Sequence, residues 1–181
     1  MSSTTDDHHG PDKFFEETPF FSDGHQRLAV SVRDFAAREI APRAGEEADV
    51  DAQFRDLLSL LAQADLLRYA VGSNADEFDA RALCLIREAL AYYSSLADLA
   101  FVMQGLGTYA ISLAAPEHVK NFWLARASEG KSIAAFALTE PEAGSDVGAI
   151  STTAERDGES SVINGRKRFI SNAGIADFYT V

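Results

Sequence analysis

The segment FALTEPEAGSD at 136–146 has the residue types of a ligand-binding loop that follows a strand. Its proline lacks a backbone donor and stiffens the turn, and its glycine permits a close backbone approach that a side chain would block. Backbone amides and the hydroxyls of Thr139 and Ser145 are therefore available to the polar edge of a ligand. Taken alone, these residue types favour a simpler alternative, an ordinary turn in which Glu140 and Asp146 are solvated.

Other sequence signatures of catalysis are absent. The chain has neither a glycine-rich dinucleotide loop nor a P-loop, and the serine of GSDVG at 144–148 is misplaced for a nucleophile elbow. His25 and His118 fall in helical contexts and are expected on the surface. The adjacent His8 and His9 could bind a metal, but no further ligand follows at a suitable spacing. We therefore expect a solvated tail there and no metal site.

The elements that must position this loop change character near Lys131. Apolar residues recur with helical spacing before it, and strand patterns follow it. Two glycines, Gly105 and Gly107, weaken the longest helical stretch and suggest either close packing or a break. The expected helices run from Ser22 or Asp23 to Pro42, from Asp51 to Leu66, from about Asp79 to Leu96 with a continuation or restart to Leu113, and from Pro116 to Gly130.

Short strands are expected in the remaining fifty residues, at 133–138, 151–156, 161–163, 167–171 and 178–181. Asn164-Gly165 predicts a tight hairpin between the third and fourth of them, and Asp157-Gly158 predicts a turn. The fold class is therefore α+β: a disordered arm at 1–19, an all-α domain at 20–130 and a partial β domain at 131–181. The last strand pattern reaches Val181, which suggests further chain or another subunit at its edge.

Composition narrows the functional classes. The 181 residues include 16 Lys plus Arg and 28 Asp plus Glu, a net charge of −12. Such a surface repels nucleic acid and anionic lipid, so neither is an expected partner. The single cysteine, Cys84, fits a reducing cytoplasm. No apolar run approaches the ~20 residues that span a bilayer, and the N-terminus lacks the layout of a signal peptide.

Two separated motifs resemble those of the acyl-CoA dehydrogenase family. The first is TEPEAGSD at 139–146, and the second is INGRKRFISNA at 163–173, followed by Ala176-Asp177. Order and spacing agree as well, and 114–131 is similar to the segment that leads into the family's middle domain. The resemblance covers about 20–181, nearly the whole chain.

The resemblance implies a helical N-terminal domain, an antiparallel, β-barrel-like middle domain and a C-terminal four-helix domain, the last of which is absent from this sequence. It implies FAD-dependent oxidation of an acyl-CoA thioester to the trans-2-enoyl-CoA, with hydrogen bonds to the thioester carbonyl that acidify the α-carbon. It further implies a homo-oligomer or a complementary chain and an electron-transfer flavoprotein as electron acceptor. The catalytic glutamate belongs to the missing domain, so no catalytic residue is assigned here.

The resemblance also assigns binding residues. Thr139 is expected to donate to the polar edge of the flavin, and Ser145 to contact both the flavin and acyl-CoA near its thioester. Phe169 replaces a common Trp over one flavin face, and Ser171 replaces a common Thr near the edge that accepts the hydride. The expected cofactor-binding set is Phe136, Leu138, Thr139, Gly144, Ser145, Phe169 and Ser171.

Several alternatives stay open. Phe169 could be an ordinary core residue and Ser171 a hydroxyl at a strand end. Lys167 and Arg168 could form a solvated edge, or could meet an acidic partner surface or CoA phosphates. The chain could also be a non-catalytic subunit that binds flavin and acyl-CoA, or part of a related flavin oxidase or monooxygenase. Acyl chain length cannot be derived from these residues.

Overall fold

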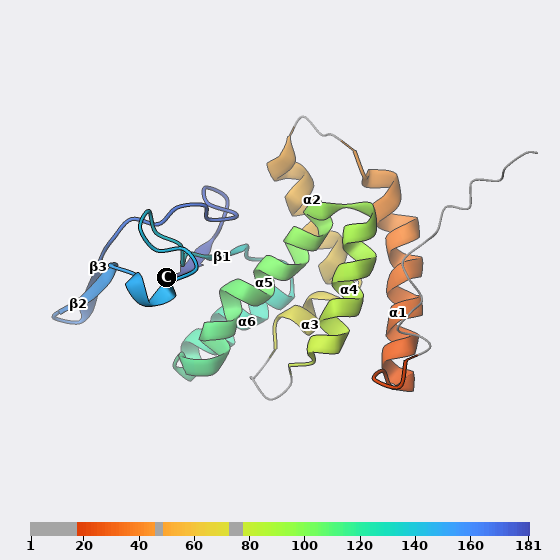
Figure 1. Ribbon diagram of the computed structural model, residues 1–181, viewed down its shortest axis with the longest axis horizontal. Helices are drawn as coiled ribbons and strands as arrows, with labels where there is room; N and C mark the ends of the chain where they lie inside the picture. Colours follow the sequence, from red (N-terminus) through yellow and green to blue (C-terminus); the bar gives the residue numbers. More distant parts are fainter. Residues whose placement is uncertain (1–17, 46–48, 73–77) are drawn as a thin grey trace, which may run out of the picture.

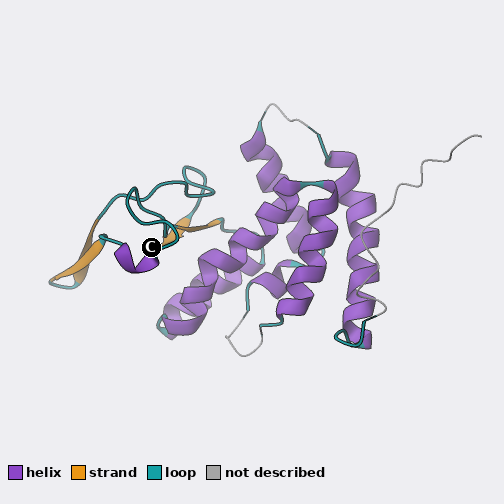
Figure 2. Ribbon diagram, in the orientation of Figure 1, coloured by secondary structure: helices purple, strands orange, loops and turns teal. Residues whose placement is uncertain are grey.

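The computed structural model describes residues 18–45, 49–72 and 78–181. The adjacent His8 and His9, which are expected in a solvated tail, and most of the expected arm at 1–19 lie outside these residues. Helices gather on one side of the molecule and the strands on the other (Figures 1 and 2). This confirms the α+β class with helices first.

The helical part runs from α1 to α6. The helices are α1 (Asp23–Phe35), α2 (Val50–Gln63), α3 (Leu67–Ala70), α4 (Ala80–Tyr93), α5 (Ser95–Ala114) and α6 (Glu117–Ser128). A π-helical turn at Ala36–Ile40 and a 3-10 turn at Ala41–Arg43 extend α1, as the apolar spacing up to Pro42 predicted.

Side-chain caps explain where these helices begin. The Asp79 carboxylate accepts from the Arg81 amide at 3.0 Å and starts α4, as expected. Ser94 is extended and its hydroxyl accepts from the Ala97 amide, so α5 restarts instead of continuing α4. The expected start of α2 at Asp51, with that residue as the cap, is wrong, because Asp49 accepts from the Ala52 amide at 2.9 Å and the helix starts at Val50. Two aspartates two residues apart offer the same signal, and only the backbone conformation selects one.

Helix α5 is the centre of the fold, in contact with α2, α3, α4, α6 and β1 (Ala134–Phe136) (Figure 1). It is long and apolar enough to cross a bilayer by length and composition. Its fully buried residues, such as Phe101, pack against core residues of neighbouring helices, among them Phe54 and Ile86. This central position accounts for its apolar composition.

The glycines of α5 allow close packing and do not break the helix. A Cβ at Gly107 would lie 2.6 Å from the Cβ of Ala134 in β1, and one at Gly105 would lie 3.0 Å from the Ala70 carbonyl oxygen. The Thr180 hydroxyl also donates to the Gly107 carbonyl at 2.6 Å. The small residues therefore bring the strands against the helical part.

The strands form two separate pairs. β1 pairs in parallel with β4 (Phe178–Thr180), with Ala134 opposite Phe178. β2 (Thr153–Asp157) and β3 (Ser160–Asn164) form an antiparallel hairpin that projects away from the helices (Figure 2). A 3-10 turn, Val147–Ala149, precedes the hairpin.

The predicted hairpin at Asn164-Gly165 is wrong. The hairpin turns at Gly158-Glu159, directly after Asp157; Gly158 has φ +62°, and Asn164 pairs with Thr153 at the far end of the ladder. Residues 166–171 form no strand and instead run beside the loop after β1. Both dipeptides favour a turn by local chemistry, and strand pairing decides between them.

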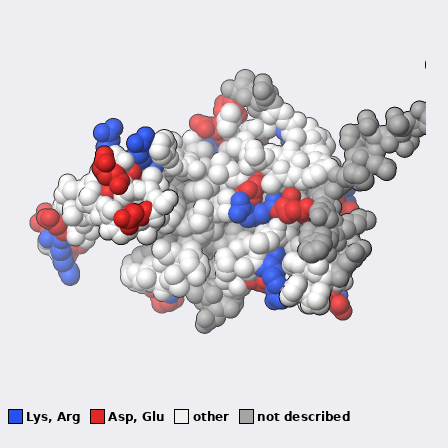
Figure 3. All heavy atoms as spheres, viewed as in Figure 1, with Lys and Arg blue, Asp and Glu red and all other residues white. Residues whose placement is uncertain are grey.

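Acidic and basic side chains on the face in Figure 3 lie in small mixed groups separated by uncharged surface. This pattern is typical of local ion pairs, such as Arg87 with Asp98 at 2.8 Å. The face offers no continuous basic field for a nucleic acid.

Candidate functional site

The loop after β1 is closed by its own backbone. The Glu140 amide donates to the Ala143 carbonyl at 2.9 Å, and the Ala143 amide donates back to the Glu140 carbonyl at 3.3 Å. Ala137 is fastened to β4 through the Thr180 carbonyl at 2.8 Å. Gly144 follows directly after this closed turn and is exposed. The sequence therefore produces a short rigid corner at the end of the strand, with its outer residues facing solvent.

Glu140 is buried inside this corner, not solvated. Its side chain is only 3% exposed. One carboxylate oxygen accepts from the amide and hydroxyl of Ser151 at 2.7 and 2.8 Å. The other accepts from the Thr152 amide at 3.0 Å, from the Thr152 hydroxyl and from Lys167 Nζ at 2.9 Å. Hydrogen bonds from the Thr152 hydroxyl, the Ser151 amide and Lys167 hold the pKa of Glu140 far below its usual range.

Lys167 joins the two motifs. Besides Glu140, its ammonium donates to the Leu138 carbonyl at 3.0 Å. The neighbouring Arg168 amide donates to the Thr139 carbonyl at 2.9 Å. The suggestion of a solvated edge is therefore wrong for Lys167, whose partner is a carboxylate of the same chain. These bonds place the expected site residues Leu138 and Thr139 beside the segment that carries Phe169.

Phe169 faces solvent. It is 80% exposed and has φ +57°, a left-handed conformation that is rare for a bulky side chain. The Arg168 guanidinium lies 4.1 Å from the ring centroid. Asn172, also left-handed at φ +65°, anchors the segment by donating to the Ala134 carbonyl at 2.9 Å. The alternative of an ordinary core phenylalanine is therefore wrong: the chain holds an exposed ring in a strained backbone.

Three expected ligand-binding hydroxyls have no protein partner. Thr139 is half-buried, whereas Ser145 and Ser171 are exposed. Within residues 18–45, 49–72 and 78–181, no protein group forms a hydrogen bond with these three side-chain oxygens. They are consequently available to a ligand.

An apolar cavity of about 560 Å³ lies between α4 and α5. Leu83 and Cys84 line it from α4, Val102 and Leu106 from α5, and Phe136 from β1. Among the described residues, Arg87 is the one charged residue of its lining, and Asp98 pairs with its guanidinium through two hydrogen bonds of 2.8 Å. Phe136, expected at the flavin, therefore also faces an apolar chamber.

This cavity was not among the features predicted from the sequence. A signal for it exists, because Val102, Leu106, Tyr109 and Leu113 recur at helical spacing on a second apolar face of α5. That face is hard to recognise in a helix whose other residues are also apolar.

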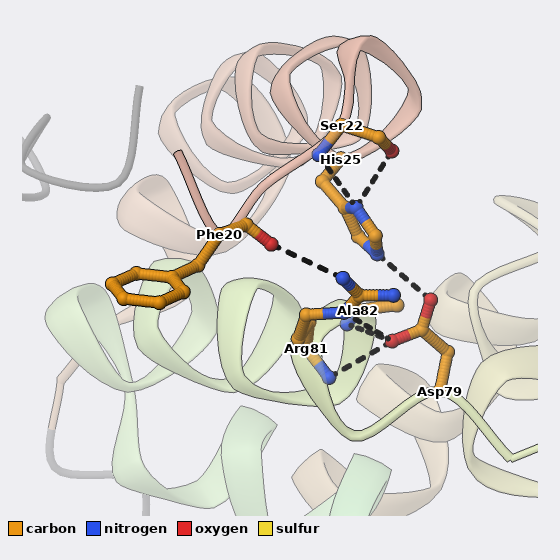
Figure 4. A network of polar contacts seen from close by, with 6 residues as sticks. All are labelled: Phe20, Ser22, His25, Asp79, Arg81 and Ala82. Carbon is orange, nitrogen blue, oxygen red and sulfur yellow. Dashed lines mark hydrogen bonds and ion pairs between the residues drawn. The ribbon is translucent and has the colours of Figure 1, made fainter. Parts of the chain in front are cut away.

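A second polar network, at His25, starts two helices (Figure 4). The Ser22 amide donates to His25 Nδ1 at 3.1 Å, so Nδ1 carries no proton and Nε2–H donates to Asp79 at 2.7 Å. The Ser22 hydroxyl lies 2.8 Å from the same Nδ1. Arg81 donates to the Phe20 carbonyl at 3.1 Å. The surface position expected for His25 is wrong, since the residue is 8% exposed; His118 is exposed, as expected.

This network has the residue types of a hydrolytic triad, but its hydrogen bonds cap the N-termini of α1 and α4. Nδ1 of His25 is occupied by a backbone amide, and the second oxygen of Asp79 caps α4. Burial alone would raise the pKa of Asp79, but hydrogen bonds from His25 and from the Ala82 and Arg81 amides outweigh it and lower that pKa. The contacts connect α1 to α4.

No metal centre accompanies the loop. Among the described residues, no group of three or more His, Cys, Asp and Glu side chains is arranged to hold a metal ion. The free thiol of Cys84 is exposed.

Comparisons with known proteins identify two consecutive domains. The acyl-CoA dehydrogenase N-terminal domain matches residues 22–131, and the acyl-CoA dehydrogenase middle domain matches residues 135–181. Together the two matches span the helical part and the strands that follow it, and the loop after β1 lies in the second match.

Individual relatives agree with these matches. The chain is 36% identical over 166 residues to a 3-(aryl)acrylate reductase of Clostridium sporogenes, covering 87% of this chain and 43% of that protein. It is 34% identical over 160 residues to cyclohexane-1-carbonyl-CoA dehydrogenase of Geobacter metallireducens, covering 85% and 41%. The chain thus spans about two fifths of the length of these curated relatives.

A solved structure has the same fold. Glutaryl-CoA dehydrogenase of Mycobacterium smegmatis in complex with FADH2 superposes with a TM-score of 0.77 at 27% identity, over 96% of this chain and 45% of that protein. Fold, motifs and sequence identity therefore lead to one conclusion: the chain belongs to the acyl-CoA dehydrogenase family.

Proposed function

We propose that this chain supplies the N-terminal and middle-domain part of an enzyme that oxidises acyl-CoA thioesters to trans-2-enoyl-CoA. FAD is the cofactor of this family. The observation that carries the proposal is that unpaired hydroxyls and the exposed Phe169 ring lie on two segments joined by hydrogen bonds, and that the first of these segments borders an apolar cavity. The proposed domain limits are 20–130 and 131–181.

The residues present fit a flavin. Its ring system is flat, apolar on its faces and polar along one edge, so it requires aromatic cover together with hydrogen-bond donors. Phe169 offers an open face, and Thr139 and Ser171 offer free hydroxyls on two segments that the Arg168 amide joins. Bound FAD would supply the acceptor for the hydride from the β-carbon.

This chain's own residues would orient the reactants and exclude water. Thr139 would donate to the polar edge of the ring, and Phe136 and Leu138 would line it. Ser145, with Gly144 beside it, would direct the thioester end of acyl-CoA. The cavity between α4 and α5 would hold apolar acyl carbons, each buried CH₂ contributing about 0.8 kcal/mol. The proton acceptor at the α-carbon would come from outside this chain.

The partners follow from the same proposal. A homo-oligomer or a complementary chain would complete the site, and an electron-transfer flavoprotein would take the electrons. We infer a cytoplasmic location from the single cysteine. The isolated 181-residue chain should bind FAD weakly or not at all. The reason is that much of a ligand's burial in such a site would come from the C-terminal helical domain and a neighbouring subunit.

The test uses the complete enzyme that contains this chain. Purified protein should carry FAD, reduce a dye or an electron-transfer flavoprotein with saturated acyl-CoAs, and release the 2-enoyl product. Turnover that needs oxygen instead would indicate an oxidase or monooxygenase. Flavin binding without turnover would favour a binding subunit. Reduction of an enoyl substrate alone would group it with the 3-(aryl)acrylate reductase, to which the chain is 36% identical.

A further inference from the structure

The Glu140 carboxylate is the point at which three chain segments meet. It follows Thr139 directly, accepts from Ser151 and Thr152 before β2, and pairs with Lys167, two residues before Phe169. Its partners lie 11, 12 and 27 residues further along the chain. One side chain therefore connects the corner after β1 with both the hairpin and the second motif.

The connections that Glu140 makes determine the relative position of the expected flavin ligands. Lys167 bonds simultaneously to Glu140 and to the Leu138 carbonyl, and the next residue bonds through its amide to the Thr139 carbonyl. The spacing between the Thr139 hydroxyl and the Phe169 ring thus depends on the Lys167–Glu140 ion pair and on the bonds to the Leu138 and Thr139 carbonyls, while Asn172 anchors the far side of the segment. Since Phe169 is exposed and its backbone strained, few contacts of its own side chain can hold it there.

Burying a charged side chain costs free energy that an ordinary turn does not require. A buried carboxylate loses its hydration. Well-packed apolar residues at a buried position often stabilise the fold as well as a buried ion pair does, or better. Glu140 is fully supplied with donors and retains its charge. A charged cluster fixes distances and directions that apolar packing leaves adjustable, and reactive sites require such accuracy.

We propose that Glu140, paired with Lys167, is a positioning residue of the flavin site, which holds Thr139 and Phe169 at the separation that the flavin ring requires. The inference rests on the proposed function for the identity of the ligand. It adds a role for a charged pair that is not among the expected flavin ligands.

Substitutions in the complete enzyme test the proposal. Glu140→Gln keeps the shape of the side chain but places an amide NH₂ donor opposite groups that are themselves donors. Lys167→Met removes the cation. Each should raise the Kd for FAD about tenfold or more, shift the visible flavin spectrum, and lower kcat by about 10- to 100-fold with a smaller effect on KM, as expected of misplaced groups. Lys167→Arg retains the cation and should keep most of the FAD affinity and kcat. The exposed Glu142→Gln serves as the matched control.

The double variant supplies an independent readout. If the two groups act as one unit, Glu140→Gln with Lys167→Met should be no worse than the more impaired single variant. A merely structural pair would lower the melting temperature while FAD affinity, flavin spectrum and kcat stay at the level of Glu142→Gln, and this result would overturn the proposal. If Glu140→Gln does not fold, the same readouts on Lys167→Met decide.

The experiment separates this inference from the proposed function. Wild-type enzyme that binds FAD but oxidises no acyl-CoA would refute the proposed reaction, while FAD affinity and spectrum of the variants would still decide the role of Glu140. Wild-type enzyme that binds no FAD would refute both.

Discussion

Gln104 in α5 connects the helical part to the first strand through a single buried amide. The side chain is fully buried, and its Nε2 donates to the Ser132 carbonyl at 2.7 Å and to the Ala127 carbonyl at 3.1 Å. Its Oε1 accepts from the Ala134 amide at 2.8 Å. The Ala127 carbonyl also accepts from the Gly130 amide, so losing its bond to Gln104 should cost the least stability.

Gln104→Met preserves length and volume but leaves two buried backbone groups, the Ser132 carbonyl and the Ala134 amide, without that partner. An unsatisfied buried group costs about 1–3 kcal/mol, so the expected loss in free energy of unfolding is about 2–6 kcal/mol. Typical domains have about 5–15 kcal/mol in total, so the variant should be severely destabilised.

Urea unfolding followed by tryptophan fluorescence measures this loss. Trp123 is the only tryptophan and lies 4.6 Å, centroid to centroid, from Phe178 in β4, so it reports on the contact between the helices and the strands. The control is Gln63→Met on the exposed face of α2, which should change the stability little. A Gln104→Met variant with the unfolding midpoint and slope of the wild type would refute the reasoning.

The remaining predictions concern packing, pH and the ligand site. Gly107→Ala should destabilise the fold by about 1–3 kcal/mol through overpacking against Ala134, whereas Gly24→Ala in the open first turn of α1 should not; equal melting temperatures would contradict this. Because the pKa of Glu140 is lowered, its stabilisation is full above pH 4.5, the ordinary value, and declines as the pH falls further. The melting-temperature gap between wild type and Glu140→Gln should therefore narrow below pH 4.5, and a constant gap from pH 7 to 3 would argue against it. Thr139→Val and Ser145→Ala should weaken FAD or acyl-CoA binding in the complete enzyme without lowering its melting temperature; unchanged binding and turnover in both would remove the assignment.

Local signals in the sequence predicted most helix limits. Asp79 and Ser94 cap their helices through their own side chains, and Pro116 and Gly130 bound α6 as their backbone preferences require. These signals act within a few residues of the position they determine.

Contacts between distant segments were not predictable in this way. The sequence could not show that the hairpin turns directly after Asp157, at Gly158-Glu159, and not at Asn164-Gly165, because the choice depends on which strands pair. It placed His25 on the surface because its partner, Asp79, lies 54 residues away.

The sequence by itself determined the order of helices and strands, and its two motifs determined the family. Only the tertiary structure decided that Glu140 is buried and charged, that Phe169 stands exposed beside Thr139, and that an apolar cavity opens next to Phe136. The physical reason is range: caps and turns are decided by neighbours in the chain, whereas burial, ion pairing and cavities arise where distant segments meet.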